Sequence, residues 1–104
     1  MSISTTQVND SATTVYTSSG NTAVTYMTFT NYTASAVALD INVVPSGDSV
    51  GSVNLIADSL EVAANDTYQI YASGEKLLLE NSDFISATAN TASAIGCVVS
   101  YTSI

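Results

Sequence analysis

The chain has 104 residues, of which 46 % are hydrophobic and only 10 % are charged, and its formal net charge is −8. This length fits one domain with one core. Lys76 is the one cation, and there is no Arg or His. Because binding to nucleic acid requires Lys or Arg to neutralise the phosphates, nucleic acid is not expected as a partner, and binding to an anionic membrane surface is disfavoured for the same reason. Abundant Ser and Thr with few helix-forming residues predict an all-β protein.

Residues 2–11 are polar, with Ile3 and Val8 as the apolar exceptions. Residues 1–12 are therefore predicted to form an N-terminal arm, or a weak edge strand that needs a partner, ahead of a domain over residues 13–104. Strands are predicted at Thr13–Thr17 and Thr22–Tyr32, on either side of a turn rich in Ser and Gly. The hydrophobic alternation slips between Val24 and Met27, which predicts a bulge or burial on both faces.

The clearest inner strand is predicted at Ala36–Val44. Pro45 and Gly47 end it, because Pro cannot donate to a ladder and Gly accepts a positive φ. The next stretch, residues 49–60, fits neither the helix nor the strand period. We expect a crossing loop there with a short strand at Asn54–Ala57; a short helical turn within residues 53–60 is the alternative. A turn at residues 63–66 and a strand at Thr67–Ala72 follow.

The last third of the chain is predicted to be a strand meander. Apolar runs at residues 75–80, 84–90 and 94–104 are separated by short clusters of turn-forming residues. In the last run Ile95, Cys97 and the alternate residues after them share one face. In total about eight strands are expected, with turns every 8 to 12 residues. The sequence thus predicts a single-domain antiparallel β-sandwich, Ig-like or jelly-roll-like.

The sequence lacks the usual groups for catalysis. There is no His to act as a general base, no Gly-rich phosphate loop, and too few Cys and His residues for a zinc site. The single Cys97 lies on an apolar face and is predicted to be a small buried hydrophobe. We predict that the protein is not an enzyme and name no catalytic, cofactor-binding or metal-binding residue.

Two kinds of side chain could nevertheless form a functional site. Turn carboxylates could converge on calcium, although Asp is also the ordinary residue of turns; the candidates are Asp48, Asp58, Glu61, Asp66 and Asp83. Together with Asp40 and Glu80 they could also supply a glycosidase pair, which the absence of Trp disfavours. Exposed tyrosines could form a contact surface for a sugar or a protein, although a core-edge position is the commoner one; the candidates are Tyr26, Tyr32, Tyr68 and Tyr71.

The N-terminus has neither the basic start nor the apolar run of a signal peptide, and no window approaches transmembrane length. Synthesis in a reducing cytoplasm without secretion by the usual route is therefore expected.

The order of strand and turn signatures is similar to that of a known group of proteins. It runs through Thr14–Val24, Asp40–Pro45, Glu75–Ile85 and Val98–Tyr101, so that it spans nearly the whole chain from about Thr13. This pattern resembles the small virion proteins, roughly 100 residues long, of tailed bacteriophages. In such relatives Gly is expected where this chain has Asn65 and Ser82.

The resemblance implies a β-sandwich subunit carried in many copies on the virion after synthesis in the host cytoplasm. The implied role is capsid decoration (cement), in which the subunit binds the major capsid protein or other virion proteins and forms a homo-oligomer, with a trimer plausible. The alternative is a tail, neck or fibre-associated module that binds carbohydrate or calcium during host attachment.

Overall fold

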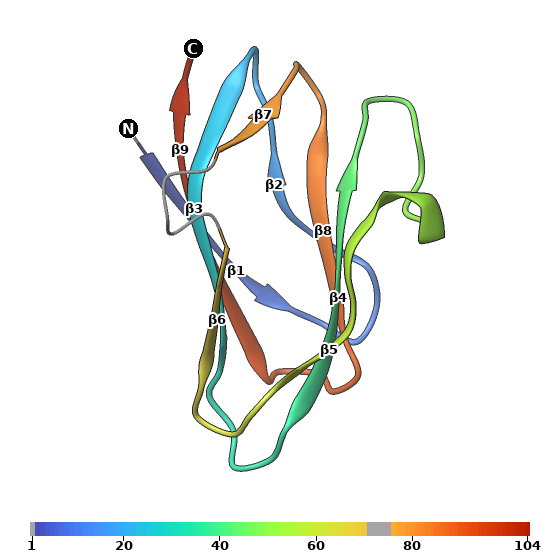
Figure 1. Cartoon of the computed structure of the whole chain (residues 1–104), viewed down its shortest axis with the longest axis vertical. Helices are drawn as coiled ribbons and strands as arrows, with labels where there is room; N and C mark the ends of the chain where they lie inside the picture. Colours follow the sequence, from blue (N-terminus) through green and yellow to red (C-terminus); the bar gives the residue numbers. More distant parts are fainter. Residues whose placement is uncertain (1, 71–75) are drawn as a thin grey trace.

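The computed structural model describes residues 2–70 and 76–104, which form a sandwich of two antiparallel β-sheets (Figure 1). The five-stranded sheet has the order β1-β9-β3-β6, with β7 also paired to β3; its strands are β1 (Ser2–Val8), β9 (Ile95–Ser103), β3 (Thr22–Asn31), β6 (Thr67–Ile70) and β7 (Leu77–Leu79). The four-stranded sheet has the order β2-β8-β4-β5; its strands are β2 (Thr13–Thr17), β8 (Phe84–Ala89), β4 (Val37–Val44) and β5 (Leu55–Val62). The predicted all-β sandwich is confirmed.

The strand pairing identifies which kind of sandwich this is. The central pair β4–β5 is enclosed in turn by the pairs β3–β6, β2–β8 and β1–β9, all antiparallel. Such nesting of strand pairs over two four-stranded sheets is the connectivity of a jelly roll, to which β7 adds a short extra strand. Of the two architectures expected from the sequence, the molecule therefore adopts the jelly roll.

The core lies between the inward faces of the two sheets. Phe29 and Val99 from one sheet and Leu39 and Ile85 from the other are fully buried. Alternate residues of a strand point to opposite faces, so the hydrophobic alternation of the sequence supplies both sides of this core. At one end of it the rings of Tyr16 and Tyr101 meet with their centroids 4.4 Å apart.

The N-terminal segment is a strand of the sandwich and not a separate arm. Ser2–Val8 pairs with the last strand from Ser2↔Tyr101 to Val8↔Ile95, and Val8 is fully buried. Its partner is thus the other end of the same chain, beside which it lies in Figure 1. The edge-strand interpretation is confirmed, and the arm proposed for residues 1–12 is wrong for residues 2–8, because pairing and burial of Val8 fix them in the fold.

The C-terminal meander is also corrected. The short β7 pairs with β3 in the five-stranded sheet, β8 lies in the four-stranded sheet, and β9 returns to the first sheet. Successive strands therefore cross the sandwich and do not pair with one another. A strand–turn–strand pattern looks the same in a sequence whether the turn closes a hairpin or carries the chain to the opposite sheet. Within β9 the predicted alternation holds, with Ile95, Cys97 and Val99 buried.

Irregular pairing occurs at three pairs of the described strands. The register of β3 against β9 shifts between Val24 and Tyr26, which confirms the predicted bulge. The register of β2 against β8 shifts between Thr14 and Tyr16, and that of β4 against β5 shifts on both sides of Ile41.

The predicted inner strand keeps its alternation against β8. Val43 lies opposite the buried Ile85 and packs against the core, and its neighbour Val44 is buried as well. The ambiguous stretch contains a 3-10 turn, η1 (Ser52–Asn54), followed by a longer strand than predicted.

Two turns explain the residues at which glycine was expected. Asn65 and Ser82 have φ values of 58° and 70°, in the left-handed region that favours Gly. Asn tolerates this conformation well and Ser less so. The strand predicted at Thr67–Ala72 is described as far as Ile70; Tyr71, Ala72 and the turn predicted at residues 73–74 lie outside the described residues.

Candidate functional site

The carboxylates proposed as calcium or glycosidase groups are divided between strands and connections: Asp40, Asp58 and Glu61 lie in strands, and Asp48, Asp66, Glu80 and Asp83 lie in connections. Asp83 accepts hydrogen bonds from the backbone N–H of Ser46 and of Glu80, both at 2.8 Å, and Asp66 accepts one from the N–H of Thr67 at 2.8 Å. Asp40 accepts one from the N–H of Ser59 at 2.7 Å. Over residues 2–70 and 76–104, no three Asp, Glu, His or Cys side chains come together as a metal site would require. Asp66 and Asp83 thus stabilise turns, whereas Asp40 bonds across from β4 to β5.

Cys97 points into the core and is 2 % exposed. Burial raises the pKa of its thiol from 9.0 to about 12, so the thiol stays neutral at physiological pH. Since the thiolate is the nucleophile, Cys97 is a buried hydrophobe, as predicted.

The outward side of the five-stranded sheet has an unusual composition. Strand pairing places one set of residues on this side, which we call the uncharged face: Ile3, Thr5, Gln7, Ala23, Thr25, Tyr26, Thr28, Thr30, Thr67, Gln69, Leu78, Gly96, Val98, Ser100 and Thr102. None of them carries a charge, although protein surfaces are normally rich in Lys, Arg, Glu and Asp. Every described carboxylate lies on the other sheet or in a connection.

Two neighbouring rows form the centre of the uncharged face. One runs across the strands as Thr5, Val98, Thr28 and Gln69, and the next as Gln7, Gly96, Thr30 and Thr67. The hydroxyls of Thr30 and Thr67 lie 3.0 Å apart, and Gln69 Nε2 donates to the Tyr26 hydroxyl at 3.3 Å. These groups both donate and accept hydrogen bonds, so the face offers uncharged polar contacts over its whole width.

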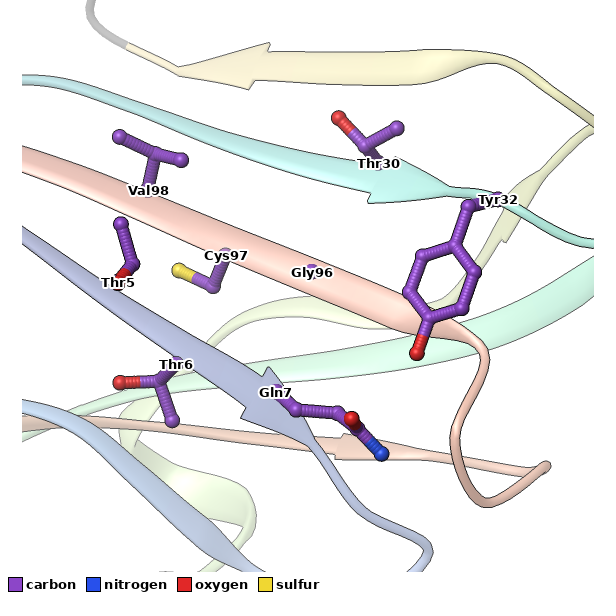
Figure 2. Close-up of a pocket in the computed structure, with 8 residues that line it drawn as sticks. All are labelled: Thr5, Thr6, Gln7, Thr30, Tyr32, Gly96, Cys97 and Val98. Carbon is purple, nitrogen blue, oxygen red and sulfur yellow. The ribbon is translucent and has the colours of Figure 1, made fainter.

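A shallow hollow of about 340 Å³ lies on the uncharged face, around Gly96 (Figure 2). Gly96 has no side chain to fill the space, and a Cβ placed there would lie 4.0 Å from a ring carbon of Tyr32. Figure 2 shows the Tyr32 ring beside Gly96, with Thr30 and Gln7 on either side of β9. The Tyr32 side chain is 53 % exposed and offers an aromatic surface at the rim.

Asn31 fixes the segment that presents Tyr32. Its side chain is fully buried, and Nδ2 donates to the carbonyls of Ser35 at 2.7 Å and Val62 at 3.0 Å. Its Oδ1 accepts from the backbone N–H of Thr33 at 2.9 Å and from the Thr33 hydroxyl at 2.7 Å. An Asn at the end of a strand is an ordinary turn signal, so sequence reasoning missed this buried network.

The outward side of the four-stranded sheet differs, because the chain itself covers part of it. Asn42 and Ser86 point outward yet are only 2 % and 1 % exposed. Asn42 Nδ2 donates to the Gly51 carbonyl at 3.0 Å and to Asn54 Oδ1 at 2.7 Å, which ties the connection between β4 and β5 to this sheet. A second hollow, of about 240 Å³, is lined by Asp40, Ser59 and Thr88 among others, so it contains a carboxylate.

The same connection and the start of β5 expose apolar side chains. Val53 in η1 is 99 % exposed, and Val50 and Ile56 are 38 % and 46 % exposed. We call this stretch, residues 50–56, the apolar loop. Asp48 and Asp58 stand on either side of it in the sequence. Its exposed apolar groups are flanked by negative charge, in contrast to the uncharged face.

The predicted tyrosine surface is only partly assembled. Tyr26 and Tyr32 lie at the uncharged face, but Tyr68 pairs with Phe29 and so has the inward parity at the sheet edge, where it is 38 % exposed. Tyr71 lies outside the described residues.

No family model, curated protein or solved structure matches this chain. Within the described residues, no helix is long and apolar enough to cross a membrane.

Proposed function

We propose that the chain is a non-enzymatic virion structural protein of a tailed bacteriophage, and specifically a capsid decoration subunit. One observation carries the proposal: exposed groups suited to protein contacts gather on two surfaces, the uncharged face, whose described strands contain no carboxylate, and the apolar loop. A protein that works by burying surface needs such contact areas, whereas an enzyme needs converging reactive groups. The resemblance to small phage virion proteins supports the same role.

In this role the apolar loop is the contact with the capsid. Val53 is almost fully exposed, and the flanking Asp48 and Asp58 suit a partner surface that has apolar groups surrounded by basic ones. Desolvating one valine contributes only a kcal/mol or two, roughly 25 cal/mol per Å² of apolar area. Many copies on one particle multiply such a contact, so a modest single interface stabilises the whole shell.

Quantitative mass spectrometry of virus particles purified from cells that produce both the chain and phage tests the proposal. Decoration predicts hundreds of copies per particle, because each capsid junction takes its own subunits. A handful of copies would instead assign the chain to the tail, neck or fibres, and its absence from particles would overturn a virion role altogether.

A binding experiment examines the contact itself. Val53→Asp is expected to weaken binding of the purified protein to undecorated capsids at least tenfold, because it places a carboxylate in the apolar contact. Its matched control is Thr14→Asp, which adds the same charge at an exposed position of β2 in the four-stranded sheet. Equal binding by the two variants would show that the apolar loop is not part of the interface with the capsid.

A further inference from the structure

The distribution of charge over the molecule distinguishes one surface from the rest. Within the described part of the chain, the strands of the five-stranded sheet contain no Asp, Glu or Lys. The four-stranded sheet has Asp40, Asp58 and Glu61 in its strands, and the other described carboxylates lie in the connections. The charged side chains of the described residues therefore lie outside the strands that form the uncharged face.

This distribution bears on how two copies of the chain can meet. Two molecules of charge −8 repel each other, and a contact through the acidic connections would bring carboxylates together and remove them from water. A contact through the uncharged face avoids both costs, since neither copy contributes a charge to it. The acidic connections, by contrast, suit a partner with basic groups.

The chemistry of the uncharged face also suits a second copy. Its Thr and Gln side chains both donate and accept hydrogen bonds, so each can pair with the same residue type across an interface. Exposed Ile3 and Leu78, which are 69 % and 66 % exposed, and the Val98 side chain between β1 and β3 supply apolar contacts. Tyr32 adds an aromatic anchor of the kind enriched at protein interfaces.

From these observations we infer that the uncharged face is the self-association surface of the protein, buried against a second copy of this chain. The inference concerns the purified protein in solution and does not depend on a virion role. The two exposed surfaces then have separate partners. The uncharged face binds the uncharged face of a second copy, and the apolar loop with its flanking carboxylates binds a different protein.

Sedimentation equilibrium of the purified full chain tests the inference. The wild type is expected to be oligomeric at tens of micromolar, and Thr28→Glu, which places a charge at the centre of the uncharged face, is expected to weaken association at least tenfold. Thr14→Glu is the matched control, because it adds the same charge at an exposed strand position of the other sheet and should leave association unchanged. Equal melting temperatures would show that both variants are folded.

The dependence of self-association on salt concentration is a second test, because the inference predicts its direction. Because the interface itself contains no ion pairs, salt only screens the repulsion between the two net charges, so association should strengthen as sodium chloride rises. An interface held by ion pairs would weaken instead.

Three results would overturn the inference. The first is a wild-type protein that stays monomeric up to about 1 mM, and the second is equal effects of Thr28→Glu and Thr14→Glu on association. The third is a monomeric protein that binds neutral oligosaccharides on a glycan array and loses this binding in Tyr32→Ala, which would assign the hollow beside Gly96 to a sugar.

Discussion

The two sheets of the sandwich share one core, but their outward faces differ in how far the chain covers them. Over the four-stranded sheet, the chain folds back, and the amide of Asn42 bonds to Gly51 and Asn54 beneath the connection. Over the five-stranded sheet, Thr5, Thr28 and Gln69 stand in a row without charged neighbours on that face. The comparison shows that the chain itself covers part of one sheet and leaves the uncharged face of the other open, which is the face that we propose for self-association.

The largest effect is expected from removing the strand that borders the uncharged face. Deleting residues 2–11 should abolish the cooperative unfolding transition, because it removes the fully buried Val8 and leaves the edge of β9 unpaired. Thermal denaturation followed by circular dichroism measures this. The control is Ile3→Ser on the same strand, whose side chain is 69 % exposed, and which should change the free energy of unfolding by less than about 0.5 kcal/mol. A deletion variant with a normal melting curve would restore the interpretation of this segment as a separate arm.

A pair of substitutions compares the two faces directly. Asn42→Ala should lower the free energy of unfolding by about 2 kcal/mol, because it removes a buried side chain together with its hydrogen bonds to the Gly51 carbonyl and to Asn54 Oδ1. Thr28→Val keeps the shape and strand preference of the residue on the open face and should be neutral within about 0.5 kcal/mol. Urea denaturation of both variants gives the values. Equal losses in the free energy of unfolding for the two variants would show that the contacts between the β4–β5 connection and the four-stranded sheet do not stabilise the fold.

The reactivity of Cys97 tests whether the five-stranded sheet, whose outward face is open, keeps solvent out of the core. Its thiol should not react with a thiol reagent at neutral pH until the protein is unfolded in guanidinium, because the buried side chain remains protonated. Rapid labelling of the native protein would show that the five-stranded sheet opens to solvent.

The same thiol predicts a pH dependence. The pKa of Cys97 is about 12 in the folded protein against 9.0 for the ordinary thiol, so in this window the folded chain keeps a proton that the unfolded chain loses. The free energy of unfolding should therefore fall as pH rises from about 9 towards 12, and the effect should be absent from the Cys97→Ala variant. Denaturation of both proteins over this range gives the difference, in which contributions common to both proteins cancel. A pH-independent difference would contradict the prediction.

The smallest effect concerns the turn by which the chain crosses from one sheet to the other. Ser82→Gly should raise the free energy of unfolding by about 0.5 kcal/mol, because Gly adopts the φ of 70° without the steric cost that Ser incurs there. Ser86→Gly is the contrasting control, since it lies within β8 in an extended conformation and should be destabilising. A loss of stability in Ser82→Gly would show that the serine side chain has a role beyond the turn.

The sequence by itself determined the parts of this protein that depend on local periodicity. Hydrophobic alternation predicted the strand at Thr13–Thr17 without error and the strand at Thr22–Tyr32 to within one residue, and the slip after Val24 predicted a bulge. These features follow from the two-residue period of a strand and from the conformational preferences of turn residues. The same reasoning predicted that Cys97 is buried, because it lies on the apolar face of its strand.

Only the tertiary structure decided how the strands are arranged and which surfaces remain open. A turn of the same sequence can close a hairpin or cross the sandwich, so the path of the last three strands and the pairing of β1 with β9 depend on contacts between distant residues. The uncharged face has the same origin. Its residues come from both ends of the chain and from its middle, and only the register of β1, β9, β3 and β6 brings them onto one surface.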